Sequence, residues 1–101
     1  TGGGLPENLP RCLPDSCSAR IDACSWTRPP LFRWLQEAGD IPERDLWHTF
    51  NLGIGFCLVV PTGSEAAVIE HCSGKSHRAW VIGNVTSNTP GSASALEGVP
   101  A

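Results

Sequence analysis

The stretch GIGFCLVVP, residues 53–61, is the longest apolar run of the chain and the one that decides its fold. It is short, contains β-branched residues and has no alternating polar residues, which is typical of a strand covered on both faces. We therefore expect residues 53–61 to form a central strand of a sheet. The run is also too short for a membrane-spanning helix.

Two predicted elements follow this run. Ser64 precedes EAAVIEHC, residues 65–72, whose composition favours a short helix that ends at Gly74. RAWVIGNV, residues 78–85, reads as a second apolar strand. Residues 52–85 should therefore run strand, helix, strand, and the predicted fold class is α+β, a mixed sheet with flanking helices.

Two predicted helices precede the run. PPLFRWLQEAG, residues 29–39, repeats its apolar residues at helical spacing and has prolines in the first turn, where no backbone donor is needed. DIPERDLWHTF, residues 40–50, places Asp40 and Glu43 at the spacing of a capping box. We expect two short helices in close succession.

The segments toward the two ends differ in composition. TGGGLPENLPR, residues 1–11, allows only a short helix after its glycines, because Pro10 removes a backbone donor. SARIDACSW, residues 18–26, alternates modestly and predicts a strand. Residues 86–101 are rich in Ser, Gly, Pro and Ala, so we expect a folded domain of residues 1–85 followed by a flexible tail.

Composition indicates one small globular domain that does not bind nucleic acid. The 101 residues are 41% hydrophobic and 17% charged, with a net charge of -3 and scattered basic residues, which excludes the clustered positive charge of a nucleic-acid-binding protein. The N-terminus lacks the pattern of a signal peptide. The five cysteines are odd in number and predict reduced thiols in a cytoplasmic protein. Because no apolar run reaches membrane-spanning length, we also expect no membrane contact.

The glycine run is the first candidate site. Gly2, Gly3 and Gly4 precede a helix start, where free N–H groups and the positive end of the helix dipole can bind phosphate or carboxylate. Asn8 and Arg11 lie close enough in sequence to assist. The spacing matches neither the Walker nor the dinucleotide motif, and such turns are often plain connections, so both interpretations stay open.

The second candidate site is HTFNLGIGF, residues 48–56. Thr49 and Asn51 lie at a predicted helix end and could face the mouth of a site. The structural alternative makes Asn51 a left-handed helix cap.

The sequence does not indicate a metal site or a catalytic triad. His71, Cys72 and His77 lack the paired spacing of zinc ligands, so we expect no metal site. No Ser/His/Asp order or carboxylate pair identifies a catalytic residue.

Four motifs of the chain together resemble the end of the phosphoribosylaminoimidazole synthetase family, the phosphoribosylformylglycinamidine cyclo-ligases. The similarity extends from Thr1 to about Val85 and rests on the order and spacing of these stretches: TGGGLPENLPR, SW…PPLFRWLQEAGDIPE, HTFNLGIGFCLVVP and RAWVIGNV. The chain departs from the family at His48, where arginine is common, and at Phe56, where methionine is common.

The resemblance implies a fold, an activity and partners. The chain would be the last portion of the C-terminal domain of an ATP- and Mg²⁺-dependent homodimeric enzyme, whose missing N-terminal half handles ATP. That enzyme closes the imidazole ring of a ribonucleotide in purine biosynthesis, and this portion alone would be inactive. The glycines would then cradle an anion. The alternatives are a non-catalytic anion-binding module and a relative such as selenophosphate synthetase.

Overall fold

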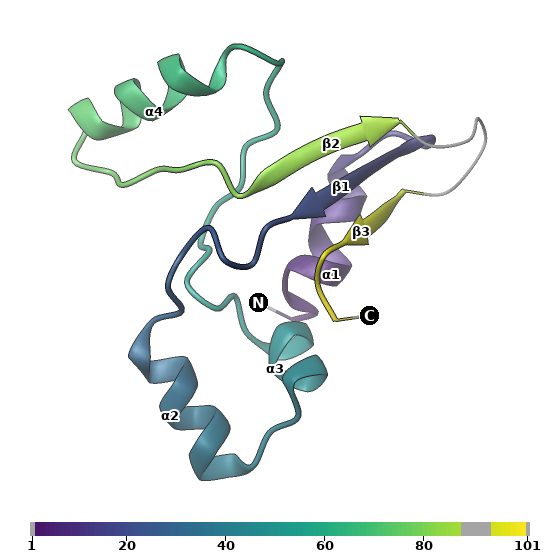
Figure 1. Ribbon diagram of the computed structural model, residues 1–101, viewed down its shortest axis with the longest axis vertical. Coiled ribbons are helices and arrows are strands. Elements are labelled where there is room, and N and C mark those ends of the chain that lie inside the picture. The colour runs from purple at the N-terminus through teal and green to yellow at the C-terminus, as the bar shows by residue number, and fades with distance from the viewer. Residues whose placement is uncertain (1, 88–93, 101) are drawn as a thin grey trace.

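The computed structural model describes residues 2–87 and 94–100 (Figure 1). Within them, three strands form one sheet in the order β2, β1, β3. Strand β1 spans Cys17–Ile21 and pairs antiparallel with β2, Gly83–Ser87, whereas β3, Ala95–Glu97, pairs parallel with β1. The sheet is therefore mixed, which confirms the predicted α+β class.

The helices of the described residues are short; α1 lies beside the sheet, whereas α2 and α4 extend away from it (Figure 1). The short helix after the glycines and the helix near residues 29–39 are both confirmed. Their bounds are α1 Gly4–Asn8, the 3-10 helix η1 Leu9–Cys12, α2 Pro30–Gly39, α3 Glu43–Thr49 and α4 Glu65–Gly74. No helix among the described residues has the length and apolar character to cross a membrane.

Two small buried clusters hold the fold together. The first joins η1 to β1, and the second joins α3 to the chain that follows it. Trp26 and Val99 pack against both clusters, so the loop after β1 and the segment after β3 connect them. Full burial of an aliphatic side chain contributes about 1.5–3 kcal/mol. The buried members are Leu9, Leu13, Ala19 and Ile21 in the first cluster and Leu46, Trp47 and Leu52 in the second.

The expected central strand at residues 53–61 is wrong. The chain there adopts no strand, and Phe56 is 85% exposed, Leu58 59% and Val59 53%. Figure 1 draws the connection between α3 and α4 as a long coil without a strand arrow. A strand requires the backbone of a neighbour, and no other described segment lies in register beside it.

The expected strand, helix, strand order of residues 52–85 is also wrong, since only α4 and β2 form. Strand β2 begins at Gly83 and not at Arg78, because pairing with β1 starts opposite Ile21. The predicted strand at residues 18–26 is confirmed only in its first part. It ends at Ile21, after which Asp22 turns the chain by accepting the Cys24 N–H at 3.0 Å.

The predicted boundary at residue 85 and the flexible tail after it need correction. Residues 86–87 belong to β2, and Ala95–Glu97 forms β3 beside β1. Leu96 packs against the first cluster and Val99 against both, so two apolar side chains suffice to fix a segment of otherwise small residues. Residues 88–93 lie outside the described chain.

The capping box predicted for Asp40 and Glu43 is wrong. Asp40 instead ends α2 in the left-handed conformation, with φ 51°, and Pro42 precedes the first residue of α3. Ser64 precedes α4 as expected, but its side chain makes no capping hydrogen bond. The Glu43 carboxylate has other partners, described below.

Candidate functional site

Packing and backbone conformation distinguish the three glycines at the start of α1. Gly3 and Gly4 are buried and have positive φ values of 90° and 57°, which favour glycine. A Cβ on Gly4 would overlap the carbonyl oxygen of Trp47 at the end of α3. Gly2 is exposed, and a Cβ there would meet nothing. The three glycines therefore have different roles.

Asn8 closes the glycine loop from within the protein. Its Nδ2 donates to the carbonyl oxygens of Gly2 at 2.9 Å and Gly4 at 2.8 Å. Its Oδ1 accepts from Arg11 at 3.4 Å. The side chain that was expected to assist ligand binding is thus already engaged in shaping the loop, and Arg11 lies exposed beside it.

Asn51 shapes the turn after α3. Its Oδ1 accepts the Gly53 N–H at 2.8 Å, and its carbonyl accepts the Ile54 N–H at 3.1 Å. The residue with left-handed φ is Leu52, at 55°, so the interpretation of Asn51 as a left-handed helix cap is wrong. The Asn51 Nδ2 makes no hydrogen bond to any residue that the structure describes.

A groove of about 370 Å³ brings part of the predicted site together. It lies between α1 and residues 54–59, and three predicted site residues line it: Gly4, Asn8 and Asn51. Gly2, Gly3, Arg11 and Thr49 are not among its lining residues. The rest of the lining is apolar except for the thiols of Cys12 and Cys57, so Asn51 supplies the amide donor that remains free there.

His48 connects α3 to α1. Its Nδ1 lies 3.7 Å from Glu7 Oε1, and its Nε2 is buried without a hydrogen-bond partner in the described chain. The position where the resembled family commonly has arginine thus faces an acidic residue on α1. A histidine there supplies a full charge only when protonated.

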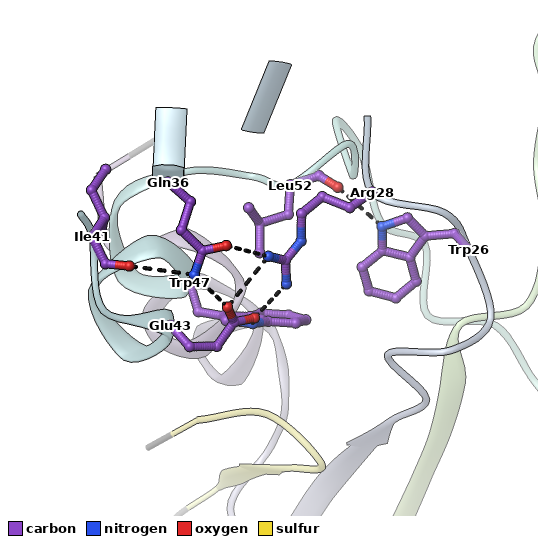
Figure 2. Close-up of polar contacts among 7 residues, drawn as sticks. All are labelled: Trp26, Arg28, Gln36, Ile41, Glu43, Trp47 and Leu52. Atoms are coloured by element: carbon purple, nitrogen blue, oxygen red, sulfur yellow. Dashed lines mark hydrogen bonds and ion pairs between the residues drawn. The ribbon is translucent and has the colours of Figure 1, made fainter. Parts of the chain in front are cut away.

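A polar network that sequence reasoning missed joins α2 to α3 (Figure 2). Arg28 and Glu43 form an ion pair, and the Glu43 carboxylate also accepts from Gln36 Nε2 at 2.8 Å and from Trp47 Nε1 at 3.0 Å. Hydrogen bonding by Arg28 lowers the pKa of Glu43 from 4.5 to about 2, against the opposing effect of burial. The available sequence signal was an opposite charge pair, with Arg28 just before the predicted helix 29–39 and Glu43 in the first turn of the predicted helix 40–50.

A second hollow, of about 310 Å³, lies beside this network, between Trp26 and Trp80. The guanidinium carbon of Arg78 lies 5.5 Å from the ring centroid of Trp80, a cation–π distance. Trp80 Nε1 is buried and has no hydrogen-bond partner among the described residues. Sequence reasoning assigned these residues only to a strand.

The described residues offer no metal-ligand cluster, and their cysteines form no disulfide. They contain no group of three His, Cys, Asp or Glu residues that could hold a metal ion. All five cysteines are free thiols. Burial raises the pKa of the Cys57 thiol above its usual 9.0, with a smaller contribution from Cys12.

Comparison with known proteins decides the family. Residues 1–94 match the family model described as "AIR synthase related protein, C-terminal domain". The chain belongs to this family. The identification agrees with the mixed sheet and short helices of the described residues.

The relatives extend the comparison to whole proteins. The chain is 85% identical over 101 residues to the phosphoribosylformylglycinamidine cyclo-ligase of Synechococcus sp. (strain CC9605), a match that covers 100% of the chain and 29% of the relative. The cyclo-ligases of Synechococcus sp. (strain CC9902) and Prochlorococcus marinus (strain MIT 9313) are 63% and 56% identical, each over 99% of the chain and 29% of the relative. The chain thus spans 29% of the length of these relatives.

Proposed function

We propose that this chain is the C-terminal part of an ATP-dependent phosphoribosylformylglycinamidine cyclo-ligase of purine biosynthesis. The enzyme would convert formylglycinamidine ribonucleotide to aminoimidazole ribonucleotide, with ADP and phosphate as co-products. The observation that carries the proposal is the 85% identity, over every residue of the chain, to a protein named for that activity. A non-catalytic module or a selenophosphate synthetase has no comparable support.

The chemistry of the reaction explains what this part would contribute. ATP phosphorylates the amide oxygen, which becomes a leaving group, and an internal nitrogen displaces it to close the ring. Such a reaction depends on positioning and on stabilising charge more than on a covalent nucleophile. We assign positioning to the groove beside α1, where the Asn51 amide is free to donate to a polar group of the substrate.

ATP and Mg²⁺ belong, in this proposal, to the rest of the enzyme. The family resemblance places the ATP-handling residues in the N-terminal half. The 101 residues alone should therefore neither hydrolyse ATP nor close the ring. A homodimeric assembly and a cytoplasmic location are further parts of the proposal, supported by the same resemblance.

A full-length chimera tests the function. In it, this chain replaces the matching 101 residues of the cyclo-ligase from Synechococcus sp. (strain CC9605). We expect the purified chimera to form aminoimidazole ribonucleotide in an ATP-dependent reaction and to rescue a bacterium that lacks its own cyclo-ligase. The matched control is the same relative without those residues, which should do neither. A folded chimera without turnover would overturn the proposal.

A further inference from the structure

The second hollow, between Trp26 and Trp80, is a separate site from the groove beside α1. It measures about 310 Å³ and shares no lining residue with that groove. Sites for small molecules begin at about 300 Å³, so the hollow has room for one small ligand. The groove assigned to the cyclo-ligase substrate leaves this hollow without a role. Its lining residues are Trp26, Thr27, Pro29, Gly53, Arg78 and Trp80.

Part of the lining is fixed by hydrogen bonds and close packing. Trp26 Nε1 donates to the Leu52 carbonyl oxygen at 3.0 Å, as Figure 2 shows. The Gly53 N–H donates to Asn51 Oδ1 at 2.8 Å, and a Cβ on Gly53 would lie 2.7 Å from Pro29 Cδ. Because these groups are held in place before a ligand arrives, binding costs little conformational entropy here.

The rest of the lining offers two donors without acceptors. Arg78 is exposed and forms no ion pair or hydrogen bond with a described residue, and its guanidinium carbon lies 5.5 Å from the Trp80 ring centroid. Trp80 Nε1 is buried and also has no hydrogen-bond partner among the described residues. A buried N–H without an acceptor is unfavourable, so a ligand that supplies an acceptor is favoured.

The charge around these donors is positive. Residues 71–87 contain Lys75 and Arg78 but no Asp or Glu. Arg28 lies next to the hollow in sequence, but Glu43 neutralises it in an ion pair. Arg78 is thus the charged lining residue whose charge is not neutralised by a described residue. An unpaired guanidinium in a hollow attracts an anion.

We propose that the second hollow binds a small planar molecule that carries a carboxylate. The carboxylate accepts hydrogen bonds from the Arg78 guanidinium and Trp80 Nε1, and the ring of the ligand packs against the indole of Trp26. A guanidinium forms charge-assisted hydrogen bonds with a carboxylate, and aromatic rings pack favourably against each other. The single guanidinium matches the one negative charge of a carboxylate better than the two of a phosphate monoester.

Titration of the full-length chimera with 1-naphthoate tests the site. This probe has a planar ring system and one carboxylate, and its size predicts a dissociation constant on the order of 1 mM or tighter. The uncharged analogue 1-naphthalenemethanol should bind about 10-fold more weakly, because it cannot pair with Arg78. Absence of naphthoate binding at about 10 mM, or equal affinity for the two probes, would overturn the proposal.

Arg78→Gln and Arg33→Gln are a matched pair of variants. Both arginines are exposed, and Arg33 lies on α2, outside the hollow. In the chimera, Arg78→Gln should weaken naphthoate binding by about 10-fold or more, whereas Arg33→Gln should leave it unchanged. Equal affinities of the two variants would show that the probe binds elsewhere, and the proposal would be wrong.

The indole signals in nuclear magnetic resonance report the contact with Trp80. In a chimera with isotope-labelled tryptophan, naphthoate should shift the Nε1–H signal of Trp80 and leave that of Trp34, which is 63% exposed on α2, in place. Trp80→Phe identifies the signal by its loss and should weaken binding by about 3-fold or more, since it keeps a ring but removes the donor. A Trp80 signal that stays unmoved at saturation would overturn the proposal.

The inference does not depend on the proposed function, because no lining residue of the second hollow lies in the groove assigned to the substrate. A chimera that binds naphthoate through Arg78 but has no cyclo-ligase turnover would support the site and overturn the activity. A chimera with full turnover and no naphthoate binding would overturn the site and support the activity.

Discussion

Arg28 and Glu43 form an ion pair that ties the segment before α2 to the first turn of α3. The network around Glu43 adds a hydrogen bond from α2 and one from Trp47, a buried residue of the second cluster. A carboxylate with several donors stays ionised to low pH. Glu43 therefore stabilises the contact between α2 and α3 and does not form a capping box.

The first prediction concerns pH. The pKa of Glu43 is lowered in the folded state, so its contribution to stability is complete above about pH 4.5 and is lost as the pH falls toward 2. Since 47% of the Glu43 side chain is exposed, solvent screening limits the contribution to about 1 kcal/mol or less. Urea unfolding of the 101-residue chain should show Glu43→Gln less stable than wild type at pH 7 and equal to it near pH 2.

The matched control for this prediction is Glu37→Gln on α2. Glu37 is exposed and has no ion pair or hydrogen bond with a described residue, so its replacement should change the unfolding free energy by less than about 0.5 kcal/mol. A loss for Glu37→Gln as large as for Glu43→Gln, or a Glu43→Gln deficit that persists at pH 2, would show that the network has no such role.

The second prediction separates the glycines of the N-terminal run. Gly4→Ala should destabilise the chain by about 2 kcal/mol or more, because the new Cβ would overlap the Trp47 carbonyl and the residue has φ 57°. Gly2→Ala should leave stability within about 0.5 kcal/mol, since its Cβ meets nothing. Denaturant unfolding of both variants checks this, and equal stabilities would refute the packing explanation.

The third prediction concerns the five thiols. Unfolded in denaturant without reductant, all five should react with a thiol reagent. In the folded chain, Cys57 should react more slowly than the exposed Cys12 and Cys24 at pH 8, because burial raises its pKa and reduces both access and the thiolate fraction. Mass spectrometry of labelled peptides over time gives the rates. Faster labelling of Cys57 than of Cys24 would contradict the burial.

The sequence predicted the elements that local pattern controls. The segment near residues 29–39 is a helix because its apolar spacing and its early prolines agree with one another. The mixed sheet was also predicted. One of its strands was expected at residues 18–26, and β1 forms over Cys17–Ile21.

The sequence failed where pairing partners decide the outcome. Residues 53–61 have a strand composition, yet a strand forms only beside another backbone, which no local pattern specifies. Ala95–Glu97 is too short for its own pattern to predict a strand, and it becomes one because it pairs with the edge of β1 and Leu96 packs against the first cluster. The ion pair of Arg28 and Glu43 was not predicted either, because its two residues are 15 positions apart and no local pattern brings them together.

Some of the predicted site residues lie together in the structure, and their role in ligand binding stays a prediction. Gly4, Asn8 and Asn51 line one groove, as a shared site requires. Their spacing in the sequence does not predict that they lie together. The role of Asn8 could not be read from the sequence, because its partners are backbone carbonyls of the loop that it follows. The glycine run was interpreted as a choice between ligand binding and plain connection, whereas Gly4 has a third use, close packing against α3.

The last prediction concerns Asn51 and separates ligand binding from turn formation. Its Oδ1 accepts the Gly53 N–H and holds the turn, whereas its Nδ2 is free among the described residues. Asn51→Asp keeps an acceptor for Gly53 but removes the amide donor, so in the chimera it should keep the melting temperature within about 3 °C and reduce kcat/KM by about 10-fold or more. Asn51→Ala removes both groups and should lower stability and kcat/KM together. The matched control is Asn8→Asp. It removes the amide that donates to two loop carbonyls, so it should lower the melting temperature, unlike Asn51→Asp. Steady-state kinetics beside thermal unfolding decide the matter: Asn51→Asp with normal kcat/KM and a normal melting temperature removes Asn51 from the site, because the free amide would then have no ligand to bind.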